Sequence, residues 1–411
     1  MGQVKLTLER PRSRLHVSAP GARRPGWRVL LVTLLLTLAT LGVGVAARAP
    51  CPRPCISDFP ILYHSRGIRP DALPYLRRNL EYPVVIGGAF YAVTLVTGTS
   101  RSFFFVTAAF MGMLALGVTV LLVRRVGTRA FLWALAPPLA LYGALNWDLL
   151  AVAPAVAGLL AYETGAFALA GCLLAVGASA KVYPVLYVVV LVVDRLATRD
   201  RRGARRVAAA ATVTALALNV PILLAAPHGW AHPFRFQAAR KPTPASLWNY
   251  VGRTPSLQPW LHGTAFSVVT SVGSPLVLAL GLGIALRRLW LRRLGPMAAA
   301  AFVTGVFLLA NKVYSPQYDL WLVPFLVLLA VPWKNVAWFL AADAVVFGVT
   351  FAILEHEVAW TQTWAWVRFV FVLFRAAAII ALLRGWLGSS RGRAIDLPAT
   401  ESAPAAQGRS L

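Results

Sequence analysis

The chain has 411 residues, of which 58% are hydrophobic and 13% are charged, and its mean hydropathy is +0.67. Soluble domains are nearer half apolar and a quarter charged, so this composition excludes an ordinary soluble domain. The formal net charge is +26. The arginines gather in short segments between apolar runs, as they do in the cytoplasmic loops of membrane proteins. This placement argues against nucleic acid as a partner.

Apolar runs of roughly 16–23 residues recur along the chain, close to the length that crosses a bilayer. The alternation of apolar and polar residues typical of membrane β-barrels is absent from the sequence. We therefore predict an all-α polytopic membrane protein, with about twelve transmembrane helices and a large first outer loop. Residues 1–28 would be a basic cytoplasmic tail, 29–384 the transmembrane domain, and 385–411 a disordered cytoplasmic tail.

The first span is predicted at 29–47 and is followed by an outer loop at 48–81. The sequence Ala47–Ala49 resembles a signal-peptide cleavage site, but the apolar run is longer than a usual signal core, which favours a retained helix. The next run, 82–98, is predicted to be interfacial or re-entrant, because every later arginine-rich loop is then cytoplasmic. The remaining spans are predicted at 103–123, 130–145, 147–162, 164–178, 182–194, 206–226, 264–286, 296–311, 317–332, 335–353 and 362–384.

This topology gives the two faces of the plasma membrane different chemistry. Both termini are cytoplasmic, and the inner loops carry mainly arginine, most densely at 195–206 and 287–293. Polar groups of varied chemistry gather at the outer face instead. They occur in loop 48–81, at 146–148, at 181–184, and in loop 227–263 with 311–318 beyond it. The asymmetry predicts an active site on the outer face.

Asp58, in the sequence CISDFP at 55–60, is the first candidate. A structural interpretation is a helix cap, since Ser57 and Asp58 are good N-caps and Pro60 suits a first turn. A functional interpretation is a general base that takes a proton from a sugar hydroxyl. Such a transfer suits a weak base when it occurs late, as the anomeric carbon becomes cationic.

Glu81 and Asp148 are two further acids at predicted membrane boundaries. Glu81 would pair with Arg77 or Arg78, or orient an acceptor. Asp148 would cap the helix that follows it, or face a cavity and orient the acceptor, since ionisable groups in membranes are costly.

Lys181, Lys312 and Arg240 are candidates for binding the phosphate of a donor. Lys181 lies between two spans with no room for a loop, so snorkelling to the interface is the alternative. Basic residues among aromatic ones in loop 227–263 would equally contact lipid headgroups.

Four residues are candidates for holding a sugar: Asn146, Tyr183, Gln317 and Tyr318. Asp343 is expected to form a buried pair with Arg368 or Arg375, without a role in chemistry. No cofactor is indicated. The sequence contains no recognisable set of metal ligands, so whether a divalent metal binds stays open.

Five short sequences, taken in order, resemble those of a known family. They are SDFP with LY (57–63), LEYP (80–83), NWD (146–148), KVYP (181–184) and NK–SPQY–W–P (311–324). Together they resemble the actinobacterial glycosyltransferase family 87, the DUF2029-type membrane proteins. That family includes polyprenyl-phosphate-mannose-dependent α-mannosyltransferases of the GT-C fold. The resemblance covers most of 29–384.

The resemblance implies inverting transfer of a sugar, α-mannose in the family, from a polyprenyl-phosphate donor to a lipid or glycan acceptor at the outer face. It implies that Asp58 is the base and that membrane lipids surround the protein. Asp319 departs from the pattern, where an apolar residue is expected. Two alternatives stay open: a twelve-span transporter, although no pseudo-symmetric halves are visible, and a non-catalytic lipid-binding protein.

Overall fold

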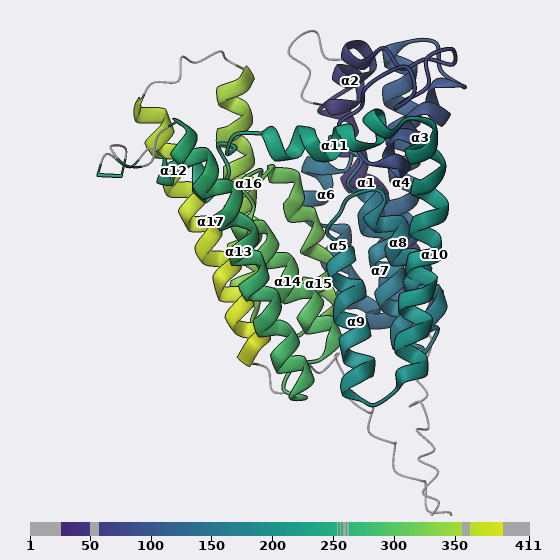
Figure 1. The fold of residues 1–411 in the computed structure, drawn as a ribbon, viewed down its shortest axis with the longest axis vertical. Coiled ribbons are helices and arrows are strands. Elements are labelled where there is room, and N and C mark those ends of the chain that lie inside the picture. Colours follow the sequence, from purple (N-terminus) through teal and green to yellow (C-terminus); the bar gives the residue numbers. More distant parts are fainter. Residues whose placement is uncertain are drawn as a thin grey trace, which may run out of the picture.

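The computed structural model describes residues 26–49, 57–355 and 362–388, apart from 253, 255, 258, 259, 261 and 262 (Figure 1). Every regular element in these ranges is a helix. Six helices are long and apolar enough to cross a membrane: Trp27–Ala46, Ser100–Ala134, Arg201–Ala225, Gly263–Trp290, Trp333–Phe351 and Trp366–Gly388. The predicted all-α, multi-pass membrane class is confirmed. Most of the predicted tails 1–28 and 385–411 lies outside the described residues.

The helices follow one another closely along the chain. They are α1 (Trp27–Ala46), α2 (Asp58–Arg66), α3 (Val84–Thr94), α4 (Ser100–Val126), η1 (Gly127–Ala130), α5 (Phe131–Ala134), α6 (Pro137–Tyr142), α7 (Leu149–Glu163), α8 (Phe167–Ala178), α9 (Val185–Ala197), α10 (Arg201–Ala225), α11 (Pro227–Ala239), α12 (Leu247–Val251), α13 (Gly263–Trp290), α14 (Pro296–Ala310), η2 (Pro316–Trp321), α15 (Val323–Leu328), α16 (Trp333–Glu355) and α17 (Gln362–Gly388).

Two predicted spans are wrong as continuous helices. The segment 130–145 is broken into the end of η1, α5 and α6, and 317–332 is broken into η2 and α15. Proline explains both breaks: it stands at 137, 138, 316 and 324, lacks a backbone N–H and cannot continue a preceding turn. Irregular backbone at membrane depth requires protein around it, and both segments are largely buried.

Helix α3 covers the run 82–98, whose crossing was uncertain. Its 11 residues extend about 16 Å, roughly half of the hydrocarbon core. Figure 1 shows α3 at the same end of the bundle as α2 and α11. The length is in keeping with an interfacial or re-entrant segment.

Helix α1 is built into the bundle. Thr37 and Thr119 of α4 share a buried hydrogen bond of 3.0 Å. A Cβ atom at Gly44 would lie 2.2 Å from the carbonyl oxygen of Ala140, so helix α1 passes very close to α6. Arg48, just beyond α1, donates to that same carbonyl at 3.3 Å. These contacts favour a retained helix over a cleaved signal peptide.

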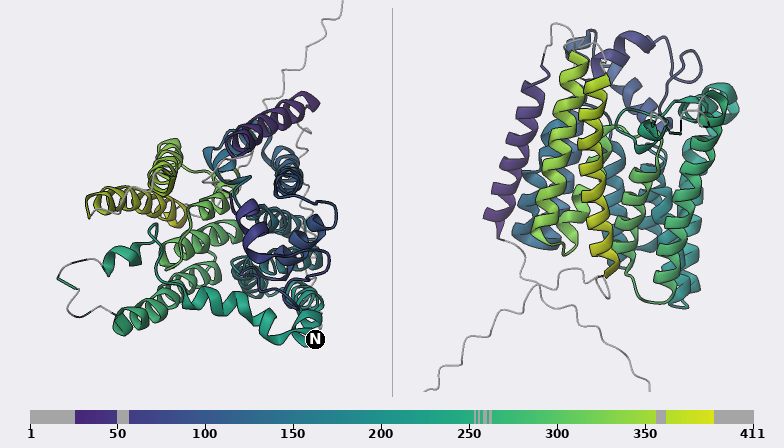
Figure 2. Two further views of the ribbon diagram at one scale, coloured as in Figure 1. Left: turned by 90° about the horizontal axis from the view of Figure 1, so that it is seen from above. Right: turned by 90° about the vertical axis from the view of Figure 1, so that its left-hand side faces the viewer.

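The helices differ in length in a way that positions the site. Helices α10, α13 and α17 have 25, 28 and 27 residues, whereas α7, α8 and α9 have 15, 12 and 13. At about 1.5 Å per residue, the short helices cannot reach both ends of a bundle made by the long ones. Helix α11 lies across the upper end (Figures 1 and 2). The arginine-rich turns α9–α10 and α13–α14 lie at the opposite end (Figure 1).

Candidate active site

The start of α2 is fixed to the turn that precedes α7. Ser57 Oγ accepts from the backbone N–H of Phe59 at 3.3 Å and donates to the carbonyl of Ala144 at 2.9 Å. The backbone N–H of Asp58 donates to the carbonyl of Leu145 at 2.9 Å. Ser57 is therefore the helix cap, and the carboxylate of Asp58 is left for other contacts.

Asn146 joins the acid to its surroundings. Its Nδ2 donates to Asp58 Oδ2 at 2.5 Å and to the hydroxyl of Tyr82 at 2.7 Å. Its Oδ1 accepts from the backbone N–H of Trp147 at 2.6 Å and from Lys181 Nζ at 3.3 Å. One amide thus contacts the candidate base and the candidate phosphate-binding cation.

Lys181 is buried, with 8% of the residue exposed. Its Nζ lies 2.9 Å from Asp148 Oδ1 and within 5.1–5.9 Å of the ring centres of Tyr82, Tyr318 and Trp321. Snorkelling does not describe this environment. Two of its three N–H groups have acceptors, in Asp148 and Asn146, which leaves one for a ligand.

Asp148 contacts the ammonium group of Lys181 and does not line either of the two cavities described below. It occupies the N-cap position of α7, but its side chain caps nothing. Oδ1 accepts from Trp321 Nε1 at 2.7 Å in addition to its pairing with Lys181. The contact pattern suits a counter-ion for Lys181.

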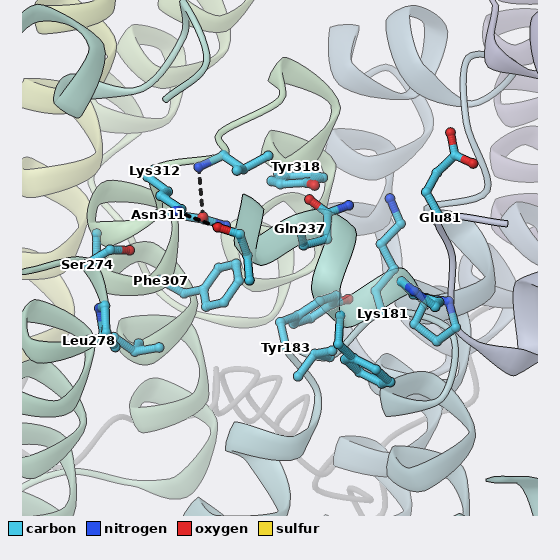
Figure 3. A pocket seen from close by; sticks show the side chains of 18 of the residues that line it. Glu81, Lys181, Tyr183, Gln237, Ser274, Leu278, Phe307, Asn311, Lys312 and Tyr318 are labelled. Carbon is cyan, nitrogen blue, oxygen red and sulfur yellow. Dashed lines mark hydrogen bonds between the residues drawn. The ribbon is translucent and has the colours of Figure 1, made fainter. Parts of the chain in front are cut away.

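Two cavities of about 420 and 610 Å³ meet at this cluster. Both are lined by the same five residues: Glu81, Tyr82, Lys181, Gln237 and Tyr318. Figure 3 shows the first cavity, with Lys181 and Glu81 on one side and Ser274 and Leu278 on the other. The cluster is therefore a shared wall between two chambers.

The first cavity runs from the shared wall towards α13 and α14. Its far part is lined by apolar groups, among them Pro275, Leu278 and Phe307. Lys312 lies on its wall, where Nζ donates to the carbonyl of Ala238 at 2.8 Å and to Ser271 Oγ at 3.0 Å. Burial lowers the pKa of Lys312. The chamber combines a polar end with an apolar length.

The second cavity holds Asp58. Arg240 and Gln317 also line it. Arg240 follows the end of α11, with its guanidinium 3.4 Å from Gln237 Oε1. Of the two chambers, Asp58 lines only this one, and Lys312 lines only the first.

The predicted sugar-binding residues surround the same place. Tyr183 stacks on Trp321 with ring centres 4.0 Å apart, and Tyr318 stacks on Trp321 at 4.3 Å. Tyr183 lines the first cavity, Gln317 the second, and Asn146 lies behind Asp58.

Two expected pairings are wrong. Glu81 pairs with Arg66 of α2, at 2.7 and 2.8 Å, and not with Arg77 or Arg78, because the end of α2 returns to the start of α3. Arg375 pairs with Asp319 at 3.0 Å. Asp343 accepts instead from the hydroxyl of Tyr142 at 2.6 Å.

Opposing effects act on the pKa of Asp58. Burial raises the pKa of the Asp58 carboxyl, while the hydrogen bond from Asn146 and the positive charge of Lys181 act to lower it, and burial prevails. A raised pKa makes a carboxylate a better proton acceptor.

Several site residues escaped sequence reasoning. Gln237 lies in the predicted loop 227–263, which in the structure contains α11. From the sequence, Trp321 is only part of a motif, and Tyr82 has no predicted role. Tyr82 was detectable in principle, because it lies between an acid and a proline at a membrane boundary.

The sequence alone does not decide whether a divalent metal binds. Among the described residues, no three or more His, Cys, Asp or Glu side chains gather in a group that could hold an ion.

Comparisons with known proteins add two structural similarities. No family profile matches the sequence, and no curated protein has a significant sequence match. The oligosaccharyltransferase of Archaeoglobus fulgidus in its apo form is similar at 13% identity and a TM-score of 0.43, over 89% of this chain and 56% of that one. ArnT from Cupriavidus metallidurans, bound to undecaprenyl phosphate, is similar at 16% identity and a TM-score of 0.43, over 88% and 77%.

The present chain thus spans little more than half of the oligosaccharyltransferase chain. The resemblance to glycosyltransferase family 87 is not confirmed by these comparisons and stays a prediction. The chemistry proposed below is argued from the site.

Proposed function

We propose that the protein is an inverting glycosyltransferase of the GT-C type. It would move a sugar, mannose by family resemblance, from a polyprenyl phosphate to a lipid or glycan acceptor at the outer face of the plasma membrane. One observation carries the proposal: Asp58 and Lys181 contact opposite ends of the same Asn146 amide, where two cavities meet.

The first cavity suits the donor. A prenyl chain is apolar and a phosphate is anionic. This chamber offers apolar walls on α13 and α14, Lys181 at the shared wall, and Lys312 beside Ser271 of α13. Each lysine keeps one N–H free of the described acceptors. Fixed cations stabilise the negative charge that develops on the departing phosphate, commonly the largest catalytic contribution.

The second cavity suits the acceptor. The acceptor hydroxyl would bond to the anomeric carbon while the bond from that carbon to the phosphate oxygen breaks. The hydroxyl proton passes to Asp58, and the electron pair leaves with polyprenyl phosphate. Inversion requires the acceptor and its base to approach on the sugar face opposite the leaving group. Asp58 in one chamber and Lys312 in the other support that arrangement.

We assign the neighbouring charged residues the following roles, from their contacts. Asp148 would hold Lys181 in place beneath the donor phosphate. Glu81 would orient the acceptor through the shared wall, with Arg66 fixing its carboxylate. Arg240 faces the second cavity, so it would contact the acceptor or the outer side of the sugar.

Transfer of mannose from polyprenyl-phosphate mannose, in proteoliposomes of the purified protein, tests the assignment. Asp58→Asn should reduce transfer by at least about a hundredfold, because the amide cannot accept the proton. Asp71→Asn is the matched control: it removes an exposed acid from the same outer segment and should leave the rate unchanged.

Full activity in Asp58→Asn would remove Asp58 as the base. Substrate uptake by the proteoliposomes without any transfer would favour the transporter. Donor binding without turnover would favour a lipid-binding protein.

A further inference from the structure

A third cavity lies at the other end of the bundle from Asp58. It has a volume of about 490 Å³ and is lined by Thr128, Arg129 and six apolar side chains, at η1, α5 and the α15–α16 connection. We call it the Arg129 cleft. The 27 residues of α4, about 40 Å of helix, separate η1 from the outer end of the bundle. The glycosyl-transfer proposal makes no use of this cleft.

Arg129 is a cation without a counter-ion in the described structure. Its Nη2 donates to the carbonyls of Leu326 and Leu329 at 2.9 and 2.5 Å, at the end of α15. Its Nε is buried and has no hydrogen-bond partner among the described residues. No described carboxylate lies within ion-pair distance of it, in contrast to Arg125 nearby, which pairs with Glu163 at 2.9 Å. A partly buried guanidinium in this state favours an anionic ligand.

The walls of the cleft show where such an anion would come from. Leu135 and Trp333 line it and are 57% and 68% exposed. Lys334, next to Trp333, is also exposed. An exposed tryptophan next to a lysine, at the end of a membrane helix, is typical of the headgroup region. A free anion in water gains nothing from the apolar walls, whereas an acyl chain does.

We infer that the Arg129 cleft binds one anionic phospholipid, with its phosphate at Arg129 and an acyl chain along Leu132, Leu135 and Leu340. Arginine suits this role, because its planar guanidinium keeps N–H groups for phosphate oxygens while others hold backbone carbonyls. Binding there would join η1–α5 to α15–α16 through the lipid. Assigning this lipid to the cytoplasmic leaflet depends on the proposed orientation of the chain, but the binding itself does not.

Native mass spectrometry of the purified protein, titrated with phosphatidylglycerol or with phosphatidylcholine, tests the inference without any transfer assay. Arg129→Gln should weaken retention of phosphatidylglycerol about tenfold, the loss expected for a charged hydrogen bond. Arg124→Gln is the matched control: it removes an exposed arginine at the same end of the bundle and should retain the lipid.

A second variant keeps the test decisive if Arg129→Gln does not fold. Leu132→Trp fills the apolar part of the cleft and leaves the guanidinium with its carbonyl partners, so it should also lose the lipid. The inference is overturned if neither variant loses phosphatidylglycerol, or if Arg124→Gln loses it equally. Equal retention of phosphatidylcholine would overturn it too, as would displacement of the lipid by millimolar inorganic phosphate.

Discussion

Asn146 connects an acidic and a basic side chain. Its Nδ2 group holds one oxygen of Asp58, and its Oδ1 faces Lys181. The amide therefore fixes how the base and the cation lie relative to each other. It also acts to lower the pKa of Asp58 against the larger effect of burial.

Removing the amide should therefore change the pH dependence of transfer. As the proposed base, Asp58 would work only when it is ionised, so the rate should fall as the pH drops through the pKa of Asp58. Asn146→Ala removes a hydrogen bond to the ionised form, which raises that pKa further. The acidic limb of the rate profile should move to higher pH, and the plateau rate should fall. A profile measured at saturating donor checks this, and an unmoved limb would show that the amide does not control the ionisation of Asp58.

Sequence reasoning reached the residues of this cluster but not their contacts. Asp58, Asn146 and Lys181 stood out because each is a polar group beside an apolar run. Which groups pair was not readable, because pairing depends on how distant segments fold back on one another. Arg66 reaches Glu81 across 15 positions, whereas the predicted partners lie only three or four positions away.

Helix α11 is held over the site by close contact with the outer segment. A Cβ atom at Gly229 would lie 1.9 Å from the carbonyl oxygen of Tyr75. Tyr75 has a φ of 69°, rare for a non-glycine residue. Its hydroxyl donates to the carbonyl of Tyr82 at 2.7 Å, next to Gly87. Tyr75 thus joins α11 to the start of α3, and Gln237 on the same helix reaches the shared wall.

Gly229→Ala should displace α11 and disturb both cavities. The added methyl group meets backbone, which cannot rotate away, so the cost is roughly 1–3 kcal/mol, as for overpacking elsewhere. The melting temperature should fall, and the transfer rate should fall with it. Gly88→Ala is the control, since it adds the same group to a helix with open space around it. Equal melting temperatures for the two variants would contradict tight docking of α11.

Where one apolar run corresponds to one helix, the predicted span lies close to the observed helix. The first span, predicted at 29–47, is observed at Trp27–Ala46, and the run 206–226 corresponds to α10. Hydropathy did not predict the helix breaks at 130–145 and 317–332, because it measures how apolar a segment is and not whether its backbone can form one continuous helix. The prolines that break these helices were visible in the sequence.

The two ends of the molecule differ: α2, α3 and α11 lie at one end, and the turns α9–α10 and α13–α14, which are rich in arginine, lie at the other (Figure 1). From the positive-inside rule we predict that the arginine-rich end is cytoplasmic. This polarity decides whether the two cavities meet lipid-linked sugars outside the cell.

Cysteine labelling should reveal the orientation. In a background lacking Cys51, Cys55 and Cys172, single cysteines replace the exposed Arg77 or Arg202. A membrane-impermeant maleimide should label Arg77→Cys in intact cells, and Arg202→Cys only after permeabilisation. The reverse pattern would place Asp58 in the cytosol and end the glycosyl-transfer proposal.

The difference in length between the long helices α10, α13 and α17 and the short helices α7, α8 and α9 has a consequence for how a donor would reach the site. Helices α9 and α10 meet at an arginine-rich turn, and α9 has 13 residues against 25 in α10. Lys181, which precedes α9, therefore lies below the far end of α10, nearer the level at which a carrier anchored by its hydrocarbon tail would present its headgroup. Under the proposed function, such a carrier would deliver its sugar by lateral diffusion, whereas a water-soluble nucleotide sugar would have to descend to that level. Depth would then select the carrier before any contact reads the sugar.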